Sequence, residues 1–340
     1  MDVRVLSDET VEWDAFVRGA PDGSPFHLMA WKRAVQTAFG HRPHYLVAGG
    51  ATGVEGVLPL FELRGLFGGR ALVSVPYGVY GGICARSGEV RQALLDSATH
   101  LARRLDARYV ELRHRAPQRM DLPTKALYVT FSRPISPSED ENLAAIPRKQ
   151  RRMTRQGAKF GLRAEFAPEH LDGFYDIYAS SVHMLGSPVF PRGLFHAIAQ
   201  EFGKDCELLT VWKDERMVAG VLTLLYEDQV LPYYGGALRE AFQYAVNDFM
   251  YWELMCHAAR AGFRVFDFGR SREGTGPYDF KRHWGFEPVP LPYQYVLRGG
   301  AALPNLSPAN PKMRLAIETW KRLPLGLTKR IGPTLTKYLP

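Results

Sequence analysis

Two ionisable side chains near the end of the chain, Asp267 and Lys281, have surroundings that suit proton transfer or anion binding. Asp267 lies in the apolar run FDFGRS, and Lys281 ends the aromatic segment YDFK, with a glycine-rich stretch between the two. A lysine among aromatic rings is partly desolvated, which strengthens its attraction for an anion. The alternatives are structural: Asp267 caps a turn by accepting backbone N–H groups, and Lys281 is a surface lysine whose stem packs on the rings.

The composition is that of a cytoplasmic globular protein of about two domains. The chain has 340 residues, of which 46% are hydrophobic and 23% are charged, and this balance argues against disorder. No apolar stretch approaches the roughly 20 residues that span a bilayer, and the N-terminal segment lacks the apolar core of a secretory signal. The three cysteines are far apart without metal-ligand spacing, so we expect reduced, buried thiols and no metal site.

The net charge of +8 is concentrated in two segments. Residues 142–164 contain seven cations and no acid, and residues 301–340 contain seven cations and one acid. This distribution predicts two localised anion-binding surfaces rather than a general nucleic-acid coat. The first run, 148–163, is interpreted either as a contact for a phosphate backbone or as an exposed amphipathic helix, and its single aromatic residue, Phe160, gives little support for base stacking.

The basic tail is predicted to contain an amphipathic helix. Its apolar face is formed by Met313, Ala316, Ile317, Trp320 and Leu323, with charged residues opposite. Such a helix over 312–323 either lies on an anionic membrane surface, which would place the protein peripherally at the inner membrane, or docks on the second domain. We slightly favour docking.

An internal repeat indicates the fold. In the first half, three strand-like segments, an amphipathic helix and the strand RYVELRH follow one another, and the second half repeats this order. VPYGVYGG and LPYYGG align at Pro76 and Pro232, and YVELR and FDFGR align at Val110 and Phe266, both 156 residues apart. Helical segments precede each copy, and the proline-containing segment 132–147 fits a linker. The fold predicted is α+β, with two tandem acyltransferase-like domains of the GNAT type, each with a central, mostly antiparallel sheet flanked by helices.

The chain resembles the Fem family of bacterial transferases. The resemblance rests on the duplicated unit, on the segment RKQRRMTRQG at 148–157, and on Tyr278, Phe280 and Lys281 of the motif Y-x-F-K. It is greatest to the FemAB-like branch associated with exosortase (PEP-CTERM) and exopolysaccharide systems, through PYGVYGG, LPYYGG, NDFMYWELM, FDFGRS and YDFKRHWGFEP. The resemblance spans most of the chain and implies acyl or aminoacyl transfer to an amine of a cell-envelope precursor, such as one of peptidoglycan or exopolysaccharide.

The resemblance also implies site residues. Lys281 is expected to hold phosphate or the reacting ester, and Asp267 to orient or deprotonate the acceptor amine; these two are the predicted catalytic residues. The predicted substrate-binding residues are Arg192, Tyr234, Arg270, Tyr278, Phe280 and Arg33. The expected domains are 1–138, 139–300 with the active site, and a basic tail at 301–340. No nucleophile elbow or Cys/His signature occurs, so direct transfer without a covalent enzyme intermediate is expected.

The acyl donor stays open at this point. The segment LREAFQYAVNDFM, which precedes the main helix of the second copy, lacks the glycine-rich loop whose N–H groups cradle the CoA pyrophosphate in typical GNAT domains. Aminoacyl-tRNA, acyl-CoA and an acyl carrier therefore remain as donors, with no tightly bound cofactor and with tRNA contact through 148–163 as one partner. The acceptor is expected to be phosphate-bearing or lipid-linked. The competing functions are an acyl-CoA-dependent N-acetyltransferase acting on a small amine and a non-catalytic scaffold of a polysaccharide or exosortase system.

Overall fold

The chain folds into two compact units, as the computed structural model shows. It describes residues 2–7, 11–50, 53–65, 68–300, 302–304 and 311–339. Unit 1 comprises Met1–Leu127, Leu291–Leu306 and Leu335–Pro340, and unit 2 comprises Tyr128–Pro290 and Ser307–Thr334. The expected division was 1–138, 139–300 and 301–340. The units differ from it because each takes one strand from beyond its own stretch of sequence.

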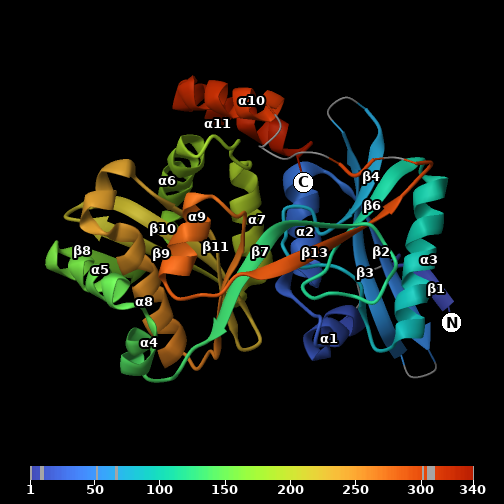
Figure 1. The fold of residues 1–340 in the computed structure, drawn as a ribbon, viewed down its shortest axis with the longest axis horizontal. Coiled ribbons are helices and arrows are strands. Elements are labelled where there is room, and N and C mark those ends of the chain that lie inside the picture. The colour runs from blue at the N-terminus through green and yellow to red at the C-terminus, as the bar shows by residue number, and fades with distance from the viewer. Residues whose placement is uncertain are drawn as a thin grey trace. The chain divides into compact units, whose positions relative to one another are not determined.

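Unit 1 is built on an antiparallel sheet with one parallel pair. The strand order is β1-β2-β3-β4-β6-β13, with the short β5 pairing with β3, and β4 and β6 are the parallel pair. Its elements are β1 (Asp2–Val5), α1 (Val11–Gly19), η1 (Pro25–His27), α2 (Met29–Phe39), β2 (Arg42–Gly50), β3 (Gly53–Arg64), β4 (Arg70–Ser74), β5 (Cys84–Ala85), α3 (Gly88–Arg104), β6 (Ala107–Arg113) and β13 (Val289–Leu297) (Figure 1).

Unit 2 repeats this order. Its strands are arranged β8-β9-β10-β11-β12-β7, and β11 and β12 are the parallel pair. Its elements are β7 (Thr124–Pro134), α4 (Glu139–Ala145), α5 (Arg148–Lys159), β8 (Leu162–Phe166), η2 (Pro168–His170), α6 (Leu171–Met184), α7 (Arg192–Phe202), η3 (Gly203–Asp205), β9 (Cys206–Lys213), β10 (Arg216–Tyr226), β11 (Gln229–Ala237), η4 (Arg239–Tyr244), α8 (Val246–Arg260), β12 (Val265–Ser271), α9 (Gly276–His283), α10 (Pro311–Arg322) and α11 (Leu325–Thr336).

The predicted repeat is confirmed strand by strand. β2-β3-β4-α3-β6 in unit 1 corresponds to β9-β10-β11-α8-β12 in unit 2, with two antiparallel pairs followed by one parallel pair in each. The expected α+β class, with mostly antiparallel sheets flanked by helices, is confirmed as well.

The segment 132–147, expected to be a linker, is ordered instead. β7 runs to Pro134 and pairs antiparallel with β12, and α4 begins after Ser138, whose hydroxyl accepts the Glu141 N–H at 3.4 Å. A paired strand and a capped helix satisfy their backbone groups here, so the prolines mark the ends of elements rather than a linker. In unit 1, β13 takes the matching position beside β6.

The alternation of side chains along the strands places helices on both faces of the sheet in unit 2. In unit 2, a Cβ on Gly220 would lie 2.7 Å from Phe174 of α6, and Val221, the next residue, belongs to the hydrophobic cluster that contains Phe249 of α8. The two helices therefore cover opposite faces of β10. Figure 1 shows α8 and α9 crossing in front of the strands of unit 2.

The two helices of the basic tail, α10 and α11, pack on unit 2, which is the docking alternative favoured above. On α10, the side chain of Ile317 lies against Gly186, which follows α6. A Cβ added to Gly186 would be 2.5 Å from Cγ2 of Ile317. On α11, Lys329 Nζ donates to Asp176 of α6 at 2.7 Å. The side chain of Met313, assigned to the apolar face, lies outside the described residues. No described helix is long and apolar enough to cross a membrane.

Candidate functional site

The strands β11 and β12 of unit 2 begin as neighbours and then part. Their parallel pairing includes only Gln229 with Val265 and Val230 with Phe266. Beyond these residues β11 continues to pair with β10, and β12 continues to pair with β7 as far as Ser271. The backbone of β11 from Leu231 onward therefore has no strand partner on the β12 side among the described residues. Asp267 is the first residue of β12 after the pairing ends.

Lys281, on α9, is buried at this end of β12 rather than lying at the surface. Only 9% of the residue is exposed, and its Nζ donates to three backbone carbonyl oxygens, those of Phe268 at 2.7 Å, Gly269 at 3.1 Å and Arg270 at 3.1 Å. The ammonium also lies 5.7 Å from the ring centre of Phe131. Three N–H bonds are the full donor capacity of a lysine. In this arrangement Lys281 holds the last turn of β12 in place.

The carbonyls converge because β12 has a bulge. The register with β7 shifts between Asp267 and Gly269, and Gly269 has a φ of +64°, a left-handed conformation that glycine adopts without strain. Asp267, which is fully buried, accepts the Gly269 N–H at 2.8 Å and the Thr130 hydroxyl at 3.5 Å. This contact is the turn-capping alternative considered for Asp267.

Burial sets the protonation of Lys281. Desolvation lowers the pKa of its ammonium to about 7, the nearby carboxylate of Asp267 partly opposes this, and the cation of Arg270 adds to the lowering. A lysine with a pKa near 7 is present in both protonation states at neutral pH, so it can give or accept a proton.

Unit 1 lacks this arrangement at the equivalent positions. Glu111 and Arg113 align with Asp267 and Gly269, and the Arg113 guanidinium donates to the Glu111 carboxylate at 2.8 Å and to the Gly78 carbonyl at 2.9 Å. The parallel pairing in unit 1 also extends one residue further, to Val73 with Glu111. Arg113 thus binds carbonyls of the segment that follows β4, whereas Lys281 in unit 2 binds carbonyls of β12 itself. A carboxylate alone does not distinguish the copies, but Gly269 and Lys281 do.

Tyr251 of α8 is a candidate that the sequence analysis missed. Its ring centre lies 5.0 Å from that of Phe268 and 5.5 Å from that of Phe280. A Cβ on Gly235 of β11 would be 2.7 Å from the Tyr251 hydroxyl oxygen, so this hydroxyl lies against the part of β11 that has no strand partner. Burial raises the pKa of Tyr251 to about 12, which keeps the hydroxyl neutral and able to donate. The glycine pair of LPYYGG was the only sequence signal for such a close approach.

The remaining predicted residues separate into two groups. Arg270, Tyr278 and Phe280 lie beside Lys281: the Arg270 guanidinium lies 4.6 Å from the ring centre of Tyr128, and the Tyr278 ring packs edge-on against Phe131. Tyr234 is elsewhere. Its buried ring packs among aromatic residues of α6 and α7, with its centre 4.9 Å from that of Phe195 and 5.7 Å from that of Tyr178.

The two predicted arginines are also apart from Lys281. Arg192, the first residue of α7, donates to the carboxylates of Asp172 and Asp176 at 2.6 Å each, and its guanidinium lies 4.5 Å from the ring centre of Tyr175. The hydrogen bond from Arg192 lowers the pKa of Asp172. An anion would have to compete with these two carboxylates for Arg192. Arg33 lies half-buried on α2 of unit 1.

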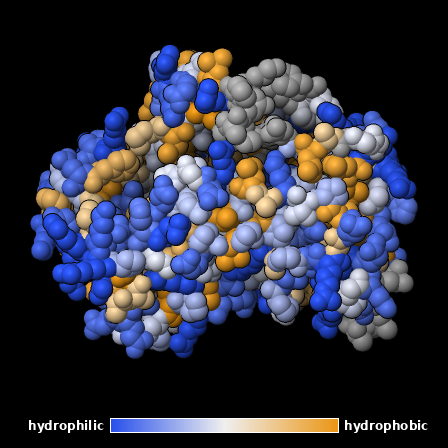
Figure 2. Space-filling view, in the orientation of Figure 1, coloured by the Kyte–Doolittle hydropathy of each residue, from blue (hydrophilic) through white to orange (hydrophobic). Residues whose placement is uncertain are grey.

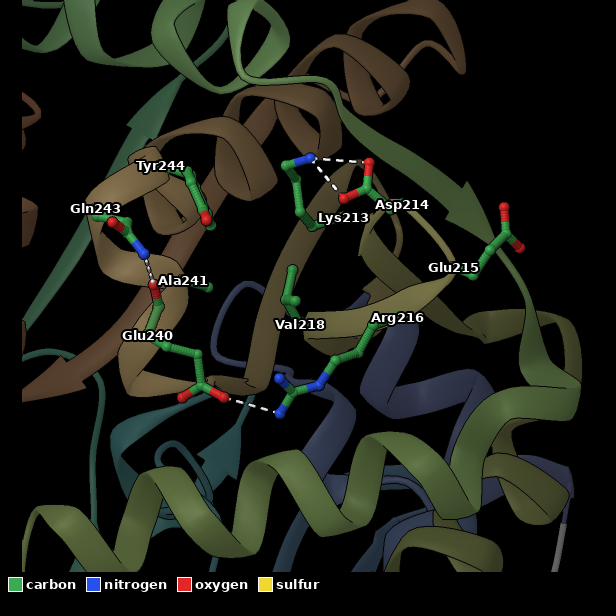
Figure 3. A pocket seen from close by; sticks show the side chains of 9 residues that line it. All are labelled: Lys213, Asp214, Glu215, Arg216, Val218, Glu240, Ala241, Gln243 and Tyr244. Atoms are coloured by element: carbon green, nitrogen blue, oxygen red, sulfur yellow. Dashed lines mark hydrogen bonds and ion pairs between the residues drawn. The ribbon is translucent and has the colours of Figure 1, made fainter.

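A hollow of about 400 Å³ lies where the chain enters α8 (Figure 3). It is lined by residues of the β9–β10 turn and of η4: Lys213, Asp214, Glu215, Arg216, Val218, Glu240, Ala241, Gln243 and Tyr244. Both cations are paired, Lys213 with Asp214 and Arg216 with Glu240, each at 2.8 Å. η4 replaces a glycine-rich loop, and three carboxylates face two cations. This hollow therefore offers a pyrophosphate group no unpaired cation.

Comparisons with known proteins agree with this architecture. Residues 142–282 match the family model described as "Acetyltransferase (GNAT) domain". A comparison with curated proteins finds no match. Among solved structures, FemX is similar with 17% identity and a TM-score of 0.69, over 87% of this chain and 98% of FemX.

Two further structures have related folds. A tandem GNAT protein from the clavulanic acid biosynthesis pathway has 13% identity and a TM-score of 0.55, over 88% of this chain and 99% of that one. The C-terminal domain of a putative lysylphosphatidylglycerol synthetase from Agrobacterium fabrum has 14% identity and a TM-score of 0.57, over 91% of this chain and 95% of that domain. The chain therefore has the fold of tandem GNAT proteins, and its residues 142–282 are similar to the acetyltransferase (GNAT) domain.

Proposed function

We propose that this protein is an N-acyltransferase of the Fem/GNAT type that transfers an acyl or aminoacyl group to an amine of a cell-envelope or exopolysaccharide precursor. The observation that carries the proposal is the end of the β11–β12 pairing after Val230, inside the segment similar to a GNAT domain. An extended donor can form hydrogen bonds with a strand edge that has no partner. The fold shared with FemX supports this assignment, and so does the resemblance to FemAB-like proteins of exosortase systems.

The chemistry proposed is direct transfer. The acceptor nitrogen attacks the acyl carbon, a C–N bond forms, and the bond from the acyl carbon to the oxygen or sulfur of the carrier breaks. The amine loses one proton, and the leaving atom gains one. Tyr251 is the candidate donor to the leaving atom, because its hydroxyl is neutral and lies over Gly235, in the part of β11 beyond its pairing with β12.

Lys281 and Asp267 act through the shape of β12 in this proposal. Lys281 binds three carbonyls and Asp267 binds the Gly269 N–H, so together they hold the bulge that separates β12 from β11. Arg270 and Phe280 lie beside this end of β12 and are proposed to contact the substrate.

The donor we favour is a carrier other than CoA, with aminoacyl-tRNA first and an acyl carrier second. The paired cations of the Figure 3 hollow weaken the case for acetyl-CoA, since its pyrophosphate would have to break an ion pair such as Arg216 with Glu240. The second candidate function is therefore an acyl-CoA-dependent N-acetyltransferase, which retains the same strand edge. A scaffold without turnover is the third.

Contact with a membrane surface is proposed through the exposed side of α10. Leu315 is 70% exposed and lies beside exposed Arg314, and Arg322 is exposed two turns later. Figure 2 shows hydrophobic and hydrophilic residues side by side on α10, at the top of the view. Trp320 is buried, so exposed leucine rather than tryptophan would meet the lipid. Such a contact would bring the enzyme to lipid-linked acceptors.

The test of the proposed function is donor binding followed by turnover. Acetyl-CoA and charged tRNA are titrated separately into the purified protein by calorimetry, and N-acylated products are then sought by mass spectrometry with envelope precursors as acceptors. Binding of charged over uncharged tRNA, with a product that Tyr251→Phe reduces by at least tenfold, is the expected result. Saturable acetyl-CoA binding with acetylation of a small amine would move the assignment to the second function. Precursor binding without any product would support the third function, a scaffold without turnover.

A further inference from the structure

A groove of about 570 Å³ lies between α4 and α5 in unit 2, apart from the residues around Lys281. This volume is within the range of small-molecule sites. The α4–α5 groove is lined by Asp140, Leu143, Ala144, Arg148, Arg151, Arg152, Arg155, Gln156 and Lys159. Five cations and one carboxylate thus face one space. In Figure 2 the surface over α5, at the left of the view, is dominated by hydrophilic residues.

The packing of α5 explains why the cations gather there. Thr154 and Gly157 are buried, and a Cβ on Gly157 would lie 2.5 Å from the Cβ of Phe249, so this side of the helix rests directly on α8. Residues at spacings of three and four lie on one face of a helix. Arg148, Arg152, Arg155 and Lys159 follow those spacings and line the groove.

The groove cations have no carboxylate partner, unlike three other surface cations of unit 2. Arg192, Arg216 and Lys213 each form an ion pair with a carboxylate. By contrast, no ion pair or hydrogen bond joins the side chain of any of the five groove cations to another residue in the described ranges, and Nε of Arg151 is buried without a partner. Like charges held this close repel one another, and a bound anion would relieve the repulsion.

We propose that the α4–α5 groove binds a diphosphate group. Four of the five cations are arginines, whose planar forks match phosphate oxygens with paired hydrogen bonds. A singly charged carboxylate would neutralise too little of the cluster. Leu143 and Ala144 supply an apolar side for whatever the diphosphate carries. The same chemistry occurs in nucleotide-linked and in lipid-linked diphosphates.

A small ligand fits this groove better than a nucleic acid chain does. The cations converge between two helices instead of following an extended track, and Phe160, the aromatic residue at the end of α5, has its ring against Tyr244. Binding of single strands relies on aromatic rings on which bases stack. The inference concerns ligand binding alone, so it stands whether or not the proposed transfer reaction is correct.

The test uses inorganic pyrophosphate and calorimetry on the full chain, with orthophosphate for comparison. Wild type is expected to bind pyrophosphate saturably and more tightly than orthophosphate. The double variant Arg152→Ala, Arg155→Ala should weaken binding by about a hundredfold, at about tenfold for each lost charged hydrogen-bonding group. Lys149→Ala removes an exposed cation of the same helix that does not line the groove, and it should change the affinity less than about twofold. Thermal melting of the variants checks the fold.

Three results would overturn the proposal. The first is that wild type shows no saturable binding, and the second is that Lys149→Ala weakens binding as much as the double variant does. The third is that a short RNA, or vesicles of phosphatidylglycerol, bind without being displaced by excess pyrophosphate while pyrophosphate itself binds no better than orthophosphate. Competition by uridine diphosphate or by farnesyl diphosphate would support it, and whichever competes better identifies the source of the diphosphate.

Discussion

The titration of Lys281 gives the sharpest test of the site's geometry. Its folded pKa of about 7 is below the unfolded value of 10.5, so between these values the unfolded chain binds a proton that the folded protein lacks. For such a depressed pKa, the stabilising contribution is complete above the unfolded value and is lost as the pH falls towards the folded value. The contribution of Lys281 to the free energy of unfolding should therefore rise with pH in this window.

The magnitude follows from the two pKa values. Between pH 7.5 and 9.5 the linkage relation gives a rise of about 2 to 3 kcal/mol from this single group. The three cysteines act in the opposite sense above pH 9, because desolvation raises the pKa of each thiol to about 12. The pH dependence of the wild-type free energy of unfolding therefore contains both effects. The difference between wild type and Lys281→Met isolates the lysine, since the cysteines are common to both.

The assay is urea unfolding, followed by tryptophan fluorescence, at several pH values from 7.5 to 9.5. We expect the stability difference between wild type and Lys281→Met to shift by about 2 to 3 kcal/mol in favour of wild type over this range. Lys204→Met, which removes an exposed lysine away from β12, is the matched control for the loss of a lysine side chain. A flat difference for Lys281→Met would refute the reasoning, because it would mean that the three carbonyls keep Lys281 charged despite its burial.

Three further predictions concern packing and buried histidines. Gly157→Ala should lower stability by about 1 to 3 kcal/mol in urea unfolding, because its Cβ would meet the Cβ of Phe249 and the two helices would have to separate; an unchanged midpoint would contradict the packing of α5 on α8. Gly235→Ala should change the free energy of unfolding by less than about 1 kcal/mol, because the added Cβ displaces only the hydroxyl end of Tyr251. It should nevertheless reduce the rate of transfer at least tenfold. Wild-type activity in this variant would show that Tyr251 takes no part in transfer. Burial lowers the pKa of His27 to about 4 and that of His114 to about 3, so their stabilising contribution is present above pH 6.5 and is lost as the pH falls. Together they should reduce the free energy of unfolding by about 4 kcal/mol between pH 7 and 5. Thermal melting of the double variant His27→Asn, His114→Asn should lack this part of the pH dependence.

The repeat and the α+β class could be predicted because they depend on local patterns. Strand alternation, glycine turns and one amphipathic helix recur in the same order in both halves, and each feature is visible within about twenty residues. The placement of β7 in unit 2 and of β13 in unit 1 could not be predicted this way. β7 pairs with Phe266 and its neighbours, and β13 pairs with the strand that contains Glu111, at sequence separations where a strand carries no mark of its partner. The prolines of 132–147 consequently looked like a linker.

The site was predictable where side chains meet side chains and unpredictable where they meet backbone. The rings around Lys281 were visible in YDFKRHW, and so was the chance that Asp267 caps a turn. The carbonyls of residues 268–270 that bind the ammonium have no signature in the sequence, because every residue carries one. The difference between the two units makes the same point. Arg113 and Gly269 occupy equivalent positions, but Arg113 binds carbonyls of the segment after β4, whereas Gly269 lies in a bulge whose carbonyls bind a lysine from the next helix. The ordinary pKa of a lysine is lower than that of an arginine, so burial can bring the pKa of Lys281 to about 7.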